Sequence, residues 1–168
     1  MKCPSCGAEN ISGVDDCESC HQDLSSLDGI VPTTRLEKVL MEDPIAKLKP
    51  RDPATVGPQE TVLAAVKKMN QHKVGSVLVL QGNRIAGILT ERDIVFKVLA
   101  KKRKPADLKV ESVMTAAPDT LDEEATLAYA VNKMAVGGFR HIPILRDNRP
   151  AGIISVRDVL KYLAKLFP

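Results

Sequence analysis

The chain has 168 residues, of which 44% are hydrophobic, 27% charged and 3% aromatic, with no Trp. This length accommodates one ordinary domain and a small module, and it excludes a large multidomain enzyme. The composition is globular, which excludes a mostly disordered or collagen-like chain. Because few aromatic side chains are available to stack on bases, a platform for single-stranded nucleic acid is not expected.

The net charge of +3 is unevenly distributed along the chain. Residues 1–43 contain 3 Lys and Arg against 9 Asp and Glu, whereas residues 44–168 contain 21 against 12. The chain starts without the apolar stretch of a signal peptide, and no apolar run approaches the roughly 20 residues of a membrane helix. We therefore expect a cytoplasmic protein that makes no membrane contact.

All four cysteines lie among the first 20 residues, in two C-x2-C pairs: Cys3 with Cys6 and Cys17 with Cys20. Two such turns supply the four sulfurs that tetrahedral Zn²⁺ prefers. Disulfides are disfavoured in a cytoplasmic chain, and a redox pair is disfavoured because no βαβ context surrounds it. The pattern predicts a structural zinc site, with iron as the alternative that only metal content or colour would separate.

The segment MKCPSCGAEN…CESCHQDL resembles the short zinc ribbons found at the ends of many bacterial and archaeal proteins. Residues 1–28 carry one Lys against six Asp and Glu, so nucleic-acid phosphate would be repelled. We interpret the ribbon as a stability element or a contact surface for a protein partner that the sequence does not identify.

The chain is expected to divide into four parts. We place a zinc ribbon at residues 1–24, a linker with a leading helix at 25–43, and two repeats at 44–103 and 104–168. The leading helix is indicated by Thr34-Arg35-Leu36-Glu37, which matches the capping-box pattern, and Pro44 marks its end.

An internal repeat fills the rest of the chain. Shifting the sequence by 65 residues aligns Pro53–Ile94 with Pro118–Val159 without gaps, at 15 identities in 42 pairs. Ordinary residue frequencies would give roughly three identities by chance. Two copies of one structural unit are therefore expected.

Each copy is expected to run strand, helix, strand, strand, helix. The first helix is indicated by apolar residues at helical spacing, Val62 to Met69 and Leu127 to Met134. The hairpin strands are expected at Val77–Leu80 with Ile85–Leu89, and at Ile142–Leu145 with Ala151–Ile154. The closing helices are expected to carry Ile94, Val95, Val98 and Leu99 in the first copy and Val159, Leu160 and Leu163 in the second. This order predicts an α/β (α+β) fold with helices packed on small sheets.

One short motif recurs where the last strand meets the last helix. It reads Gly87-Ile88-Leu89-Thr90-Glu91-Arg92-Asp93 in the first copy and Gly152-Ile153-Ile154-Ser155-Val156-Arg157-Asp158 in the second. A hydroxyl followed three residues later by an acid is a capping-box variant, which needs no ligand. The same groups also suit a nucleotide. The helix N-terminus and the hydroxyl could bind phosphate, the Arg could add charge, and the carboxylate could accept from a ribose diol.

With VMT at residues 113–115 and FRHIPIL at 139–145, this motif resembles the tandem cystathionine β-synthase (CBS) domain pair over residues 34–168. The resemblance implies a pair with pseudo-twofold symmetry and two clefts that bind AMP, ADP, ATP or S-adenosylmethionine. It implies that Thr90 and Ser155 contact phosphate and that Asp93 and Asp158 contact ribose. The other implied ligand contacts are Arg92, Met114, Thr115, Thr120, Arg140, His141 and Arg157.

The two clefts are expected to be unequal, because only the second copy has Arg140 and His141 where the first has Gly75 and Ser76. We expect a regulatory, ligand-sensing protein without catalytic activity, AMP as its leading ligand, and a homodimer formed through the repeats. The alternative is a scaffold whose clefts stay empty and whose Thr, Ser and Asp residues act only as helix caps. An enzyme is disfavoured because the three His, at positions 21, 72 and 141, match no hydrolase motif.

Overall fold

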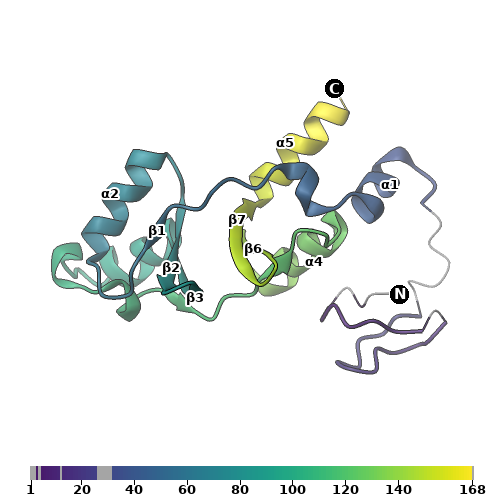
Figure 1. The fold of residues 1–168 in the computed structure, drawn as a ribbon, viewed down its shortest axis with the longest axis horizontal. Coiled ribbons are helices and arrows are strands. Elements are labelled where there is room, and N and C mark those ends of the chain that lie inside the picture. The colour runs from purple at the N-terminus through teal and green to yellow at the C-terminus, as the bar shows by residue number, and fades with distance from the viewer. Residues whose placement is uncertain (1–2, 4, 12, 26–31, 168) are drawn as a thin grey trace. The chain divides into compact units, whose positions relative to one another are not determined.

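A computed structural model describes residues 3, 5–11, 13–25 and 32–167 (Figure 1). The backbone contacts divide the chain into two compact units, one formed by residues 1–49, 123–140 and 156–168, the other by residues 50–122 and 141–155. Most of the linker expected after residue 25 falls on residues 26–31, which lie outside the described residues. Within the described residues, no helix is long and apolar enough to cross a membrane.

The cysteine-rich segment consists of two similar turns. In the first, the Cys3 N–H donates to Ala8 O at 2.8 Å and the Gly7 N–H donates to Cys3 O at 2.9 Å. The second repeats this pattern, with Cys17 N–H to Gln22 O and His21 N–H to Cys17 O, both at 2.9 Å. Gly7 and His21, each four residues after the first cysteine of its pair, have φ of +78° and +56°. Only Gly adopts this left-handed conformation without steric cost.

Both repeats have the predicted order of elements. The first contains β1 (Thr55–Val56), α2 (Val62–His72), β2 (Ser76–Gln81), β3 (Arg84–Thr90), α3 (Glu91–Asp93) and the π-helix η2 (Ile94–Leu99). The second contains β5 (Leu121–Asp122), α4 (Leu127–Gly137), β6 (His141–Arg146), β7 (Arg149–Ser155) and α5 (Val156–Leu166). The α/β prediction is therefore confirmed (Figure 1).

The two small sheets have matching topology. In each, a short first strand pairs in parallel with the second, and the second pairs antiparallel with the third, giving the orders β1-β2-β3 and β5-β6-β7. A fourth strand, β4 (Thr115–Ala116), adds to the free edge of β3. The register is equivalent as well, because Ser76 faces Thr90 and His141 faces Ser155. The equivalent strands β3 and β7 contact each other.

The first helix of each repeat begins at a threonine cap. The Thr61 hydroxyl accepts the Ala64 N–H, and the Thr126 hydroxyl accepts the Tyr129 N–H. Such a bond satisfies an amide that has no partner within the helix. Apolar residues at helical spacing are buried on both helices: Val62, Ala65 and Met69 on α2, and Leu127, Ala130 and Met134 on α4.

The core is aliphatic, as expected from a composition with few aromatic residues. In the first repeat one cluster joins α2, the hairpin and the segment after η3 (Pro105–Asp107). Its fully buried members are Val62, Ala65, Val77, Val79, Leu89, Val98 and Val110. Burial of this apolar surface is the dominant stabilising contribution to such a domain.

The helix that closes the first repeat differs from the expected α-helix. After Glu91–Asp93 it continues as a π-helix over Ile94–Leu99, with the Ala100 N–H donating to Val95 O at 2.9 Å. Its apolar residues recur at a spacing of four, as in Ile94 and Val98. That spacing lies between the 3.6 residues of an α-turn and the wider π-turn, so the pattern alone does not separate them.

A short lead-in segment precedes each repeat. The first contains α1 (Arg35–Glu42) and the 3-10 turn η1 (Ile45–Leu48), and the second contains η3 and the 3-10 turn η4 (Val110–Ser112). The predicted capping box of α1 is confirmed, because the Thr34 hydroxyl accepts the Glu37 N–H and the Glu37 carboxylate accepts the Thr34 N–H.

The lead-in segments are exchanged between the repeats. In the second lead-in segment, Leu108 O accepts the Val62 N–H at 2.9 Å and the Val110 N–H donates to Glu60 O at 2.9 Å. This segment therefore holds the start of α2, which belongs to the first repeat. In the first lead-in segment, Asp43 O accepts the Leu127 N–H at 3.0 Å and the Ile45 N–H donates to Ala125 O at 2.8 Å, which holds the start of α4. These bonds correspond pair by pair at the 65-residue offset.

Candidate ligand-binding and metal sites

Thr90 and Asp93 form a complete capping box at the end of β3. The Thr90 hydroxyl accepts the Asp93 N–H at 3.2 Å, and Asp93 Oδ2 accepts the Thr90 N–H at 3.0 Å. The Thr90 hydroxyl also donates to Asp93 Oδ2 at 2.6 Å. The structure therefore places these two predicted site residues in contact, and both of them cap the helix.

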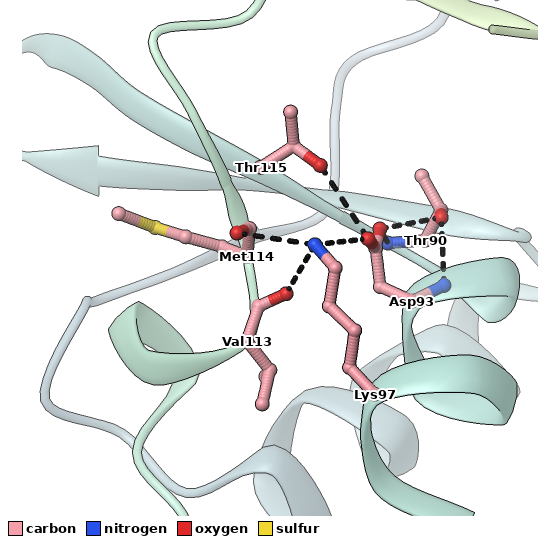
Figure 2. A network of polar contacts seen from close by, with 6 residues as sticks. All are labelled: Thr90, Asp93, Lys97, Val113, Met114 and Thr115. Atoms are coloured by element: carbon pink, nitrogen blue, oxygen red, sulfur yellow. Dashed lines mark hydrogen bonds and ion pairs between the residues drawn. The ribbon is translucent and has the colours of Figure 1, made fainter. Parts of the chain in front are cut away.

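The other carboxylate oxygen of Asp93 faces Lys97 and Thr115 (Figure 2). Lys97 Nζ lies 2.6 Å from Asp93 Oδ1, and the Thr115 hydroxyl donates to the same oxygen at 3.4 Å. Lys97 Nζ also donates to Val113 O at 2.9 Å and to Met114 O at 3.4 Å. Three sequence segments, β3, the closing helix and residues 113–115, therefore meet at one carboxylate.

The charge of Asp93 is stabilised where it lies. The side chain is 11% exposed, and this burial acts to raise its pKa. Hydrogen bonds from Lys97 and Thr90 outweigh that effect and hold the pKa below its usual range. The group is therefore an ionised carboxylate at neutral pH, able to accept hydrogen bonds but not to donate them.

Met114 and Thr115 belong to this arrangement (Figure 2). The Arg92 side chain is exposed, and its guanidinium lies 5.8 Å from the centroid of the Phe96 ring. Sequence reasoning missed Lys97, although an Asp and a Lys four residues apart on a helix form a recognisable ion pair. The bonds of Lys97 to the carbonyls of Val113 and Met114 could not be predicted, because no sequence pattern near Lys97 indicates them.

The predicted site residues of the second repeat divide between the two units. The unit that contains β5, β6 and β7 holds Thr120 just before β5, His141 at the start of β6 and Ser155 at the end of β7, all half-buried. The other unit holds Arg140, Arg157 and Asp158. Arg140 and Arg157 are exposed, and Asp158 is half-buried in the first turn of α5.

A different polar network occupies the helix of the second repeat. Tyr162 stands four residues after Asp158, as Lys97 does after Asp93. Its hydroxyl donates to Asp43 Oδ2 at 2.6 Å, and Lys47 pairs with Asp43 Oδ1. Burial acts to raise the pKa of Asp43, but its bonds from Lys47 and Tyr162 hold it below the usual range. The bond to Asp43 in turn raises the pKa of Tyr162.

The four cysteine sulfurs converge on one point. All four Sγ atoms lie within 4.8 Å of one another, with 3.6 Å between Cys3 and Cys20 and 3.5 Å between Cys6 and Cys17. Zn–S bonds of about 2.3 Å in a tetrahedron place the sulfurs about 3.8 Å apart. The donor set and its spacing therefore fit a tetrahedral thiolate-bound metal ion.

Groups around Cys17 favour its thiolate form. Burial acts to raise the pKa of Cys17, but backbone bonds from Cys20 and Ser19 and the Asn10 amide bring it down to about 6. Asn10 Nδ2 lies 3.5 Å from Cys17 Sγ, and Asn10 Oδ1 accepts the Glu18 N–H at 2.9 Å. Asn10 thus joins the two turns and orients a sulfur, as outer-sphere groups of metal sites do.

Comparison with known proteins agrees with this architecture. The CBS domain family matches residues 45–100 and 110–165. A 17.7 kDa protein of Acidianus ambivalens is 38% identical over 110 residues, which cover 64% of this chain and 65% of that protein. The chain spans less than two thirds of the length of the curated relatives it matches.

Solved structures show the same fold. A CBS-domain protein from Burkholderia ambifaria is similar with a TM-score of 0.68 and 30% identity, covering 78% of this chain and 94% of that one. The CBS domain pair of protein MJ0100, solved with 5′-methylthioadenosine and S-adenosyl-L-methionine, is similar with a TM-score of 0.66. It covers 73% of this chain and 97% of that one at 22% identity, which supports the fold alone. With two matched repeats and these structural neighbours, the chain belongs to the CBS domain family and contains a tandem pair.

Proposed function

We propose that the chain is a ligand-sensing regulatory protein whose CBS pair binds an adenine nucleotide and has no catalytic role. The observation that carries this proposal is the meeting of Thr90, Asp93 and Thr115 where β3 joins its helix. A hydroxyl at a helix start and an ionised carboxylate beside it are the groups that a phosphate and a ribose diol require. The MJ0100 pair, which shares this fold, was solved with adenosine-containing ligands, and the proposal extends that ligand class to this chain.

AMP is the leading ligand of this proposal, with ADP, ATP or S-adenosylmethionine as the other members of the class. In the first repeat Asp93 accepts from the ribose, Thr90 binds phosphate, and Met114 and Thr115 line the site with Arg92 as a nearby charge. In the second repeat Asp158 takes the ribose role and Ser155 the phosphate role. Arg140, His141 and Arg157 add positive charge there, and Thr120 completes the contacts.

The cysteine-rich segment is proposed to be a zinc ribbon that contacts a protein partner in the cytoplasm. The fit of four thiolates to tetrahedral Zn²⁺ supports the metal, and iron is the alternative with the same donors. A homodimer formed through the CBS pair is also proposed. Regulation then requires that the nucleotide bind one arrangement of the pair more tightly than another.

Thermal unfolding with AMP, ADP, ATP and S-adenosylmethionine tests the ligand, with CMP as a ribonucleotide of a different base. A ligand at about 100 times its Kd stabilises the folded state by about 2.7 kcal/mol. We expect stabilisation by an adenine ligand that is reduced in Asp93→Asn or Asp158→Asn. Equal stabilisation by CMP would contradict selectivity for adenine.

A scaffold without ligand is the second candidate, because the Asp93 carboxylate is already fully engaged by Thr90, Lys97 and Thr115. The titration separates the two candidates. Absence of stabilisation by every adenine ligand, in a protein that unfolds cooperatively, supports the scaffold and overturns the sensor.

Elemental analysis of the purified protein tests the ribbon. We expect one zinc ion per chain, a colourless solution, and loss of the metal in Cys17→Ser. Ser19→Ala is the matched control, because Ser19 lies between Cys17 and Cys20 in the same turn and its side chain is exposed. A coloured protein that contains iron would show that the site holds iron and not zinc. A protein without metal would overturn the metal site.

A further inference from the structure

The acceptor positions of the Asp93 carboxylate are all used within the chain. Oδ2 accepts the Thr90 N–H at 3.0 Å and the Thr90 hydroxyl at 2.6 Å. Oδ1 accepts Lys97 Nζ at 2.6 Å and the Thr115 hydroxyl at 3.4 Å. A carboxylate offers about four lone-pair positions. A hydroxyl group of a ligand therefore binds Asp93 only by replacing one of these four donors.

The donors on Oδ1 are the ones that can leave. Both bonds to Oδ2 come from Thr90, and they are part of the cap that starts the helix. Lys97 reaches Oδ1 on a flexible stem that is 41% exposed, and it keeps a second partner, Val113 O, at 2.9 Å. The Thr115 contact is the longest of the four. A vicinal diol brings two donors, which match the two positions on Oδ1.

We propose, resting on the function above, that Lys97 competes with the ligand's diol for Asp93 and thereby sets the affinity of the first repeat's site. The Lys97 ammonium contacts Asp93 Oδ1 (Figure 2), the oxygen that a diol hydroxyl takes in this proposal. Each binding event at Asp93 then includes breaking this ion pair. Lys97 acts through Asp93 and is a specificity-determining residue rather than a direct ligand contact.

The second repeat has no cation at this position. Tyr162 replaces Lys97 at the 65-residue offset, and its hydroxyl donates to Asp43 on the first lead-in segment. Competition from the residue four positions after the Asp is therefore confined to the first repeat, a difference between the two sites in addition to that at Arg140 and His141.

Titration calorimetry with AMP and 2′,3′-dideoxy-AMP tests the competition, because the second probe lacks both hydroxyls. Lys97→Met keeps the aliphatic stem and removes the charge. We expect it to tighten AMP binding about twofold to fivefold, the range of a partly exposed ion pair, and to leave binding of the dideoxy probe unchanged. All titrations use an Asp158→Asn background so that the first site is observed alone.

Lys68→Met is the matched control. Lys68 is 40% exposed, donates to a backbone carbonyl (Thr55 O, at 2.9 Å) and lies near a carboxylate of Glu60, but it does not contact Asp93. We expect no change in AMP binding for this variant. Lys97→Gln serves as a second substitution, and unfolding curves of both Lys97 variants test whether the fold is retained.

Two outcomes overturn the inference, and a third concerns the proposed function on which it rests. Unchanged or weaker AMP binding in Lys97→Met and Lys97→Gln would show that Lys97 does not compete. An equal gain for AMP and for dideoxy-AMP would show a general charge effect unrelated to the diol. Failure of every Asp158→Asn variant, including the one with native Lys97, to bind AMP would show that the first site does not take AMP, and failure of the chain with native Asp158 as well would overturn AMP binding in the proposed function.

Discussion

The two repeats share a framework and differ in how the closing helix is fastened to the lead-in segment beside it. In the first repeat the cation is on the helix, because Lys97 donates to Asp93 and to the backbone carbonyls of Val113 and Met114. In the second repeat the helix supplies the neutral Tyr162, and the charge is on the lead-in segment at Asp43, where Lys47 neutralises it. The equivalent helix positions 97 and 162 thus both attach the closing helix to a lead-in segment, one through a lysine and the other through a tyrosine.

This difference separates stability from ligand binding. The Asp43 side chain is 12% exposed and is held by a lysine and a phenol, neither of which belongs to the candidate ligand site. The ion pair of the first repeat involves Asp93, which is itself a candidate ligand contact. We infer that attachment and ligand binding are coupled in the first repeat and separable in the second.

The largest expected effects test whether the repeats contribute equally to the fold. Leu89 and Ile154 occupy equivalent strand positions and are 0% and 1% exposed. Leu89→Ala and Ile154→Ala should each lower the free energy of unfolding by about 2 to 5 kcal/mol, from lost burial and the cavity left behind. Urea denaturation measures both. A variant that shifts only part of the transition would show that the repeats unfold separately.

The two attachments should differ in strength. Tyr162→Phe removes a hydrogen bond to a mostly buried carboxylate and should cost about 1 to 3 kcal/mol. Lys97→Met breaks a pair whose lysine is 41% exposed, and it should cost less than about 1 kcal/mol. Thermal unfolding of the two variants compares them directly. A larger loss in Lys97→Met would reverse the comparison.

At acid pH, both repeats should lose stability for the same reason. The pKa values of Asp43 and Asp93 are lowered in the folded chain, so the stability they contribute is present above the unfolded pKa of about 4. This stability is lost as pH falls through the lower folded pKa values. Both repeats therefore contribute to the fall of stability at acid pH, here called the acid limb of the stability curve. The acid limb should be shallower in Asp43→Asn and in Asp93→Asn, measured by thermal unfolding between pH 2 and pH 6.

An alkaline limb should belong to the second repeat alone. The bond to Asp43 raises the pKa of Tyr162, so its stabilising effect is present below the unfolded pKa of about 10 and is lost as pH rises through the folded value. Tyr162→Phe should reduce this alkaline loss, leaving the part due to Lys47, whose pKa Asp43 also raises. It should also weaken the acid dependence slightly, because Tyr162 helps to lower the pKa of Asp43. An unchanged alkaline limb in that variant would contradict the assignment.

The smallest effects concern the residue that ends the first helix of each repeat. Lys73 and Gly138 are equivalent, and their φ values are +53° and +65°. Because a side chain is strained in this conformation, Lys73→Gly should stabilise the chain by about 0.5 to 1 kcal/mol. Gly138→Ala should destabilise it by a similar amount. Differential scanning calorimetry resolves both, and a loss of stability in Lys73→Gly would show that its contacts outweigh the strain.

The repeat and its elements could be predicted because they depend on local spacing. Apolar residues such as Val62, Ala65 and Met69 recur at helical spacing, and threonine caps precede the helices at Thr34 and Thr61. The convergence of the four cysteines follows from short, regular spacing in the same way. These features are specified within about 20 residues of chain, where the sequence pattern and the structure agree.

The exchange of the lead-in segments could not be predicted. Identities between the copies begin at Pro53 and Pro118, and no identical pair precedes them between residues 43 and 52 at the same offset. The equivalence of Asp43 and Leu108 lies in their backbone carbonyls, which accept corresponding amides whatever side chain is present. For the same reason the contacts of Lys97 with two backbone carbonyls have no signature in the sequence.

The exchanged lead-in segments determine where the chain can be divided. A fragment that ends near residue 104 loses Leu108 and Val110, whose backbone bonds hold the start of α2. A fragment that begins there loses Asp43 and Ile45, which do the same for α4. A gene encoding a single copy could supply the missing segment only from a second chain, so tandem duplication converts a swapped dimer into one continuous polypeptide.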